Sequence, residues 1–240
     1  MWIRSKWWRM LVAQFSSPVC AVCCKPLLYY EREICMCCRT TAPLTGFWQQ
    51  HDNPVQQKLS GLVPIEEGSA LLFFVQGSGW QRFIHSFKYF RRFGLAREVG
   101  RWYGSLLKES GLYDDVEVVV PLPLHPFKRL SRGYNQVDFL AEGIAESLGL
   151  PVERRSLVRC RNTHAQARTP HRERAANVEG AFAVRHSEYL AGRHLLLVDD
   201  VLTTGSTLTA AAEALLEAVP EVQISIAALA VSRREVGIAD

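Results

Sequence analysis

The second half of the chain alternates apolar runs with segments whose apolar residues repeat at helical spacing. Strands are predicted at residues 116–121, 195–198 and 223–231, and the unbroken apolar run at 195–198 is typical of a parallel strand covered on both faces. Helices are predicted over residues 137–148 and 208–219, where apolar residues recur every three or four positions. Strand, loop, helix and strand in this order form a βαβ unit, so we expect an α/β domain with a parallel sheet flanked by helices.

The first half of the chain predicts fewer elements. Residues 70–75 form an apolar run that ends before a Gly-Ser-Gly turn, which predicts a strand. Helices are predicted from Trp80 onward and over residues 95–107, again from spacings of three and four. The expected organisation is an N-terminal segment and finger-like region at 1–40, a connecting region with one strand at 41–79, and the main α/β domain at 80–240.

The stretch from Leu195 to Thr207 joins a predicted strand to a predicted helix. Asp199 and Asp200 follow its four apolar residues, at the carboxyl end where open α/β sheets bind ligands. Residues 203–207 lead into the helix, so backbone N–H groups, the helix dipole and hydroxyl groups can surround a phosphate there. The two carboxylates would repel that phosphate, and they suit ribose hydroxyls or Mg²⁺ instead. The stretch therefore predicts a ligand with a sugar diol and a terminal phosphate, unless it is only an acidic surface turn before a capped helix.

Composition narrows the class of protein only slightly. The chain has 240 residues, of which 48% are hydrophobic, enough for one sizeable core and a smaller appendage. Charged residues make up 22% and the net charge is +4, which argues against disorder and does not by itself indicate a nucleic-acid partner. Apolar runs are too short to span a membrane, and the N-terminus lacks the pattern of a cleaved signal peptide. We therefore expect a cytoplasmic protein without a membrane span.

Six of the seven cysteines lie between residues 20 and 38. Without export a disulfide framework is unfavourable, and local clustering favours a metal site. Cys20, Cys23, Cys35 and Cys38 form two C-x2-C pairs, the spacing of a tetrahedral structural Zn²⁺ site. Cys24 and Cys37 are surplus and leave the choice of ligands open, and free buried cysteines are the alternative.

Three basic segments have two interpretations each. Residues 1–17 combine three tryptophans with three basic residues, and they form either a packing helix or a surface on which single-stranded bases stack. Lys88, Arg91 and Arg92 either contact phosphates or lie on a solvated helix face. Residues 159–180 are polar, basic and long for a connection, which indicates a functional segment or a disordered insertion.

The run L-L-L-V-D-D-V-L-T-T-G-S-T resembles the 5-phosphoribosyl 1-pyrophosphate (PRPP) signature of type I phosphoribosyltransferases. The resemblance implies a phosphoribosyltransferase-like parallel sheet flanked by helices, preceded here by the small four-cysteine zinc finger. It implies PRPP with Mg²⁺ as the ligand, with Asp199 and Asp200 as catalytic acids that hold the ribose hydroxyls. It further implies three sets of binding residues: Val201, Leu202, Thr203, Thr204, Gly205, Ser206 and Thr207 for PRPP; Lys128, Arg129, Arg132 and Gly133 for pyrophosphate; and Arg168, Arg172 and Arg174 in a flexible loop that closes over the site.

Further motifs resemble the ComF (GntX-like) family of bacterial phosphoribosyltransferase-like proteins. They are the cysteine finger, P-L-H-P-x-K-x-x-x-R-G-Y-N-Q from residue 123, T-H-A-Q from 163, R-x-x-N-V-x-G-A-F from 174 and H-x-x-K-Y from 85. This resemblance implies a role in natural competence and the handling of incoming single-stranded DNA. The expected partners are PRPP or a ribose 5-phosphate compound, single-stranded DNA, competence proteins and a second copy of the chain. The alternative is an active PRPP-dependent glycosyltransferase of nucleotide metabolism, whose base or amine acceptor the sequence does not identify.

Overall fold

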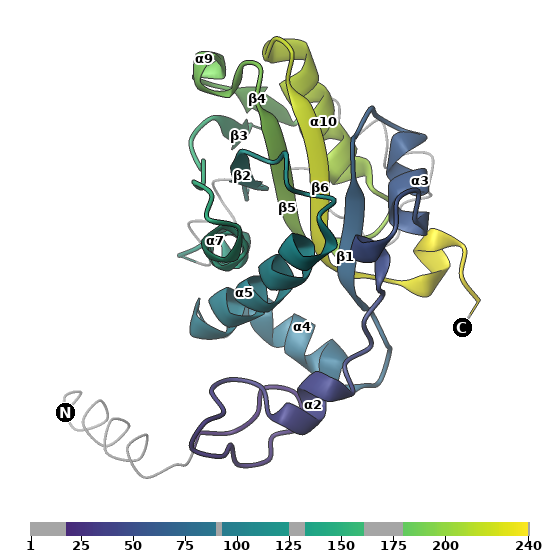
Figure 1. The fold of residues 1–240 in the computed structure, drawn as a ribbon, viewed down its shortest axis with the longest axis vertical. Coiled ribbons are helices and arrows are strands. Elements are labelled where there is room, and N and C mark those ends of the chain that lie inside the picture. The colour runs from purple at the N-terminus through teal and green to yellow at the C-terminus, as the bar shows by residue number, and fades with distance from the viewer. Residues whose placement is uncertain (1–17, 90–92, 125–132, 161–179, 240) are drawn as a thin grey trace, which may run out of the picture.

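The structure is a computed structural model that describes residues 18–89, 93–124, 133–160 and 180–239. Its centre is a parallel sheet with the strand order β1-β6-β5-β2 (Figure 1). The four strands are β1 (Gly68–Phe73), β2 (Val118–Pro121), β5 (His194–Leu202) and β6 (Gln223–Val231). The predicted parallel sheet is confirmed, and β5 lies inside it, between β6 and β2.

The helices predicted from Trp80 onward and at 95–107, 137–148 and 208–219 are present within a few residues, whereas the short helices α2, α3 and α9 were not predicted. In chain order the remaining elements are α2 (Met36–Thr40), the 3₁₀ turn η1 (Phe47–Gln49), α3 (Pro54–Ser60), α4 (Gly79–Tyr89), α5 (Phe93–Ser110), α7 (Gln136–Leu148), β3 (Leu157–Arg159), β4 (Phe182–Val184), α9 (Ser187–Leu190), α10 (Ser206–Ala218) and the 3₁₀ turn η2 (Arg233–Val236). Strands β3 and β4 pair antiparallel as a separate ribbon. None of the helices in the described ranges is long and apolar enough to cross a membrane.

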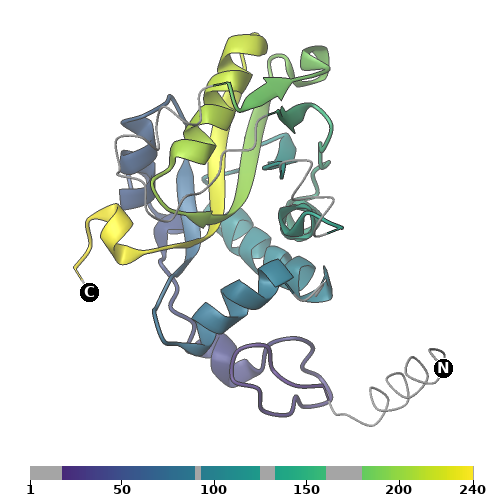
Figure 2. The same ribbon diagram turned by 180° about the vertical axis from the view of Figure 1, so that it is seen from behind.

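Both faces of the sheet are covered, which explains the unbroken apolar run of β5. Leu196 and Val198 pack into the core layer formed with α4, α5 and α7. Leu195 and Leu197 point the other way, into the layer formed with α3 and α10. All four side chains are fully buried, and each contributes on the order of 1.5–3 kcal/mol to folding. The two layers appear on opposite sides of the sheet when Figures 1 and 2 are compared.

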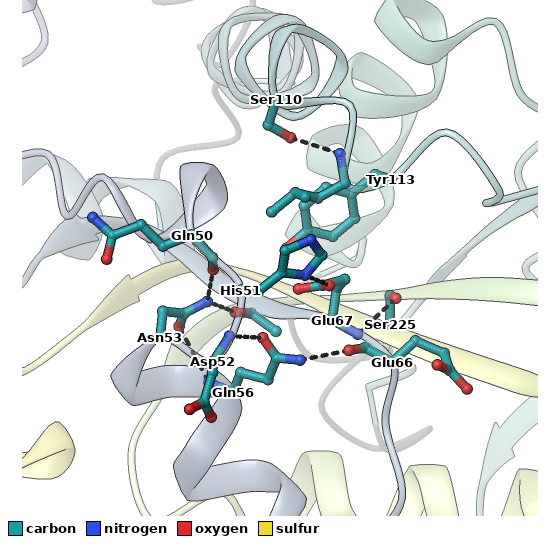
Figure 3. A network of polar contacts seen from close by, with 12 residues as sticks. Gln50, His51, Asp52, Asn53, Gln56, Glu66, Glu67, Ser110, Tyr113 and Ser225 are labelled. Atoms are coloured by element: carbon teal, nitrogen blue, oxygen red, sulfur yellow. Dashed lines mark hydrogen bonds and ion pairs between the residues drawn. The ribbon is translucent and has the colours of Figure 1, made fainter.

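Segment 41–79, expected to be a connecting region, supplies the edge strand β1, which pairs with β6. The segment is tied to the amino end of the sheet by polar contacts (Figure 3). Asn53 is 2% exposed and caps α3 through Val55, and its Nδ2 atom also donates to the carbonyl of Gly68 at 2.7 Å. His51 Nδ1 lies 2.5 Å from the buried carboxylate of Glu67. Helix α3 is therefore held in a fixed position beside the sheet.

The four-cysteine finger packs onto one of the two core layers of the sheet. Cys20, Val22 and Ile34 belong to the core layer of α4, α5 and α7. A Cβ atom on Gly79, at the start of α4, would lie 2.6 Å from the carbonyl oxygen of Val22, so glycine is needed where the finger backbone meets this helix. The finger packs at the α4 end of the molecule, away from β3, β4 and α9 (Figure 1).

Candidate functional site

The predicted acid pair lies at the carboxyl end of an inner strand. Asp199 and Asp200 belong to β5, which continues to Leu202 because its pairing with β6 runs that far. A pocket of about 280 Å³ opens beside them. Its lining includes residues 122–124 after β2, both acids, and Thr203 and Thr207. The structure thus brings the ends of β2 and β5 and the start of α10 together at one edge of the sheet.

Two neighbours constrain the two carboxylates. Asp199 Oδ1 accepts a hydrogen bond from the backbone N–H of Asp200 at 2.7 Å. Asp200 Oδ2 accepts one from Nε2 of Gln136 at 2.9 Å. Arg159, at the end of β3, also lines the pocket, and burial lowers the pKa of its guanidinium while the charge of Asp199 opposes that shift. A cationic group therefore lies within electrostatic range of the acid pair.

The predicted phosphate loop has the geometry that anion binding requires. Gly205 is the N-cap residue of α10 and has a φ of 89°, a left-handed conformation that glycine adopts without strain. Thr204 and Ser206 hydroxyl groups lie 2.9 Å apart beside it, and the first turn of α10 contains no acidic residue. The positive end of the helix dipole therefore faces the loop without a competing carboxylate.

Helix α3 and the residues just after it pack against this loop. A Cβ atom on Gly205 would lie 3.3 Å from Cδ2 of Leu59 and 3.4 Å from Cδ1 of Leu62. Leu202, predicted to bind PRPP, is 1% exposed and packs in the core, so only its backbone can serve a ligand. Val201 and Thr203 do line the pocket.

Several predicted residues lie outside the described ranges. Gly133 is described, with a φ of 80° and an exposed position just before α7. The others are Lys128, Arg129 and Arg132 of the pyrophosphate loop, Arg168, Arg172 and Arg174 of the flexible loop, residues 1–17, and Arg91 and Arg92, together with the side chain of Lys88.

Two polar residues that line the pocket are absent from the predicted site residues. Gln136 closes the R-G-Y-N-Q motif, which was considered only for its basic residues and glycine. Arg159 is the first residue of the predicted polar loop at 159–180, and the structure places it at the end of β3, a strand too short to be predicted. The available indications were an amide at a predicted helix start and a basic residue at the edge of the predicted loop.

The four predicted cysteines form a second site in the finger. The sulfur atoms of Cys20, Cys23, Cys35 and Cys38 all lie within 4.8 Å of one another. Surplus Cys24 and Cys37 are not part of this group, and both are exposed. The structure therefore separates the four cysteines with the predicted spacing from the two extra ones.

The pKa values of Cys20 and Cys38 are shifted in opposite directions. Burial opposes the thiolate form of Cys20, but backbone hydrogen bonds from Cys23, Cys35 and Val22 outweigh it and lower the pKa to about 7. Burial raises the pKa of Cys38 far above its ordinary range, and the neighbouring thiols raise it further. Four thiolates in one buried cluster need a compensating charge, which a divalent cation supplies. The cluster could hold a metal ion on these grounds.

Fold and site together define the class of protein. A parallel sheet with an acid pair and a hydroxyl-rich loop at the carboxyl end of an inner strand is the arrangement predicted for a phosphoribosyltransferase-like domain. The family model "Phosphoribosyl transferase domain" matches residues 139–237 of the chain, a range that includes β5, the loop after it and α10. The predicted fold class is confirmed, including an N-terminal cluster of cysteines able to bind a metal.

Three named proteins are similar to this chain in sequence. The chain is 32% identical over 130 residues to Competence protein F of Haemophilus influenzae, an alignment covering 52% of this chain and 56% of that protein. It is 33% identical to the DNA utilization protein YhgH of Salmonella typhimurium, in an alignment that covers 55% of this chain and 59% of that protein. It is 34% identical to Competence protein ComFC of Bacillus subtilis, in an alignment that covers 45% of this chain and 42% of that protein. The chain thus spans roughly half the length of each of these relatives, which confirm the predicted resemblance to the ComF family.

Proposed function

We propose that this protein binds PRPP, or a related ribose 5-phosphate compound, together with Mg²⁺ in the pocket beside Asp199 and Asp200, and that it acts as a ComF-type protein of natural competence. The observation that carries this proposal is the placement of the acid pair and the Gly205 loop at one edge of the sheet. An acidic patch alone would repel a phosphate, and a phosphate loop alone would not recognise a ribose. Their combination suits a phosphorylated ribose.

Each part of the ligand has a complementary part of the site. The loop at 203–207 binds the 5′-phosphate through backbone N–H groups and hydroxyls. Asp199 and Asp200 accept hydrogen bonds from the ribose hydroxyls, and their carboxylates would hold Mg²⁺, which would offset the negative charge of the pyrophosphate. The sequence further predicts contacts to pyrophosphate from Lys128, Arg129, Arg132 and Gly133 and a closing loop with Arg168, Arg172 and Arg174; of these residues only Gly133 is described.

Binding of separate ligand fragments tests this assignment. Thr207→Val keeps the shape of a pocket-lining side chain and removes its hydroxyl. Binding of ribose 5-phosphate should weaken by about fivefold to tenfold, the effect of one lost hydrogen bond. Pyrophosphate binding, measured in the same calorimetric experiment, should stay unchanged. Equal losses for both fragments, or none for ribose 5-phosphate, would place the 5′-phosphate elsewhere.

Catalysis is the second candidate function, and the paired acids favour it. Transfer of the ribosyl group to a base or amine develops positive charge at the ribose, and preorganised carboxylates stabilise such charge. Mg²⁺ would contribute charge neutralisation of the leaving pyrophosphate. Release of pyrophosphate from PRPP, measured with a panel of bases, amines and ammonia, tests this candidate. An absence of release with every acceptor leaves the protein as a PRPP-binding factor without turnover on that panel.

The metal in the finger is proposed to be a structural Zn²⁺. Tetrahedral Zn²⁺ with Zn–S bonds of about 2.3 Å requires sulfur atoms about 3.8 Å apart. The sulfurs of Cys23 and Cys35 lie 3.8 Å apart. With all four positions filled by cysteines, such an ion would hold the finger folded and would leave no position for substrate.

Handling of single-stranded DNA is proposed from the relatives and from the basic segment at 88–92. Two relatives are named as competence proteins and one as a DNA utilization protein. Replacing Lys88, Arg91 and Arg92 with alanine should weaken single-strand binding and reduce its salt dependence. The matched control replaces one lysine and two arginines on exposed positions elsewhere: Lys108, Arg185 and Arg234. Equal losses in both variants would indicate only a nonspecific effect of net charge.

A further inference from the structure

Gln136 lies against the acid pair although it belongs to a different strand–helix unit. It is the first residue of α7 and is only 3% exposed. Its Nε2 atom donates a hydrogen bond to Oδ2 of Asp200 at 2.9 Å. Burying an amide costs free energy unless hydrogen bonds replace its contacts with water. The bond to Asp200 supplies such a replacement and fixes one oxygen of this carboxylate from the α7 side of the pocket.

Asn135 in turn fixes the position of Gln136. Asn135 is 4% exposed and caps α7, because its Oδ1 atom accepts from the N–H of Val137 at 3.3 Å. Its Nδ2 atom donates to the carbonyl of Leu122, just after β2, at 3.1 Å and to Asp138 at 2.7 Å. The start of α7 is thereby attached to the end of β2. A side chain on such an anchored backbone holds its partner in a defined orientation.

We infer that Gln136 is a positioning residue for the ribose-binding acid Asp200. It holds Oδ2, so that the carboxylate meets the ribose hydroxyls in one orientation instead of several. This inference rests on the proposed PRPP site, because it concerns how that site is prepared for ribose. Gln136 acts through Asp200 and takes no part in the chemistry itself.

The amide is the chemically suitable group for this task. A lysine or arginine at this position would form an ion pair with Asp200 and compete with Mg²⁺ for its charge. A carboxylate would repel Asp200. A neutral donor orients the acid and leaves its negative charge available to the ligand. The type of side chain therefore matters as well as its size.

The test uses Gln136→Glu, whose side chain has nearly the same shape. At about pH 8 two facing carboxylates repel each other, and PRPP affinity should fall by about tenfold or more relative to wild type. At acidic pH two carboxyl groups this close share a proton, because each disfavours the charge of the other, and the protonated acid donates the hydrogen bond that the amide donated. The ratio of variant to wild-type affinity should therefore recover as the pH falls. Taking this ratio at each pH cancels the titration of PRPP itself.

Two further variants complete the design. Gln136→Met keeps the length of the side chain but cannot donate, so its affinity should be about tenfold lower at every pH. Gln223→Glu introduces the same charge at an exposed position at the amino end of β6 and should match wild type throughout. Circular dichroism at each pH confirms that the variants remain folded.

The outcomes separate the two proposals. A deficit in Gln136→Glu that disappears at low pH, with a deficit in Gln136→Met that does not, supports the positioning role. A deficit in Gln136→Glu that is independent of pH, or full affinity in Gln136→Met, overturns it. Failure of the wild-type protein to bind PRPP contradicts the proposed function instead, before any variant is compared.

Discussion

At the residue scale, Gly205 connects the strand that carries the acids to the helix that we propose faces the phosphate. Its φ of 89° is a conformation that other residues adopt only with strain. A Cβ there would lie 3.3 Å from Leu59 and 3.4 Å from Leu62, so these flexible side chains would need to move only slightly. The glycine is therefore required chiefly by the conformation of the loop backbone.

Gly205→Ala should lower the free energy of unfolding by about 1–2 kcal/mol through left-handed strain and should weaken PRPP binding by tenfold or more, because relief of that strain shifts the loop backbone. Gly192→Ala is the matched control, since Gly192 also has a positive φ, of 67°, but a Cβ atom added there would meet no atom of the described residues within 4 Å. The control should lose stability and keep its affinity. Urea unfolding and calorimetry measure the two quantities, and equal affinities for both variants would contradict the role given to the loop.

The cysteines allow a second prediction at this scale. Cys35→Ser should abolish stoichiometric zinc, because it removes one of four sulfurs gathered within 4.8 Å. Cys24→Ser and Cys37→Ser should retain one zinc per chain, since both side chains are exposed and lie outside the cluster. Elemental analysis of the purified variants measures this directly. Loss of zinc in either control would mean that the ligands are a different set of four.

At the scale of elements, helices α5 and α7 approach until their backbones touch. A Cβ atom on Gly143 would lie 2.1 Å from the carbonyl oxygen of Arg97, and one on Gly100 would lie 2.3 Å from that of Leu140. A glycine in a helix normally costs up to about 1 kcal/mol relative to alanine. The cost is offset here by a close helix crossing that also fixes α7, and with it Gln136, against the sheet.

Gly143→Ala should therefore destabilise the protein by about 2–4 kcal/mol, since rigid backbone must move to admit one methyl group. Gly94→Ala, in α5 itself, is the control: its Cβ would meet only the flexible side chain of Glu33, at 3.1 Å, among the described residues. That substitution should be neutral or slightly stabilising. Midpoints of urea unfolding compare the two, and a neutral Gly143→Ala would disprove the close crossing.

At the scale of the whole molecule, the sequence predicts those features that depend on residues close together in the chain. The apolar runs predict the strands, and the D-D and T-T-G-S-T positions predict which edge of the sheet carries the site. It does not predict contacts between distant segments. The pairing of β1 with β6 joins residues far apart in the chain, the contact of Gln136 with Asp200 depends on how α7 packs, and the role of Gly143 depends on a partner helix.

Segments from distant parts of the chain pack around the pocket beside Asp199 and Asp200. The segment at 41–79 supplies both an edge strand and the helix α3 that packs behind Gly205. The α5–α7 pair holds the start of α7 beside Asp200. The finger is joined to the α4 and α5 side of the core and lies away from β3 and β4 (Figure 2). We therefore expect the finger to stabilise the core, with the phosphoribosyl ligand bound elsewhere.

The central claim is that the acids of β5 bind a phosphorylated ribose. Calorimetric titration of PRPP with Mg²⁺ into wild type, Asp200→Ala and the exposed-site control Asp114→Ala tests it most directly. We predict saturable binding at one site per chain in wild type and in Asp114→Ala, and a loss of at least about tenfold in Asp200→Ala, which removes a charged hydrogen-bond acceptor. Undetectable binding to the wild type, or equal affinity in Asp200→Ala, would contradict the claim.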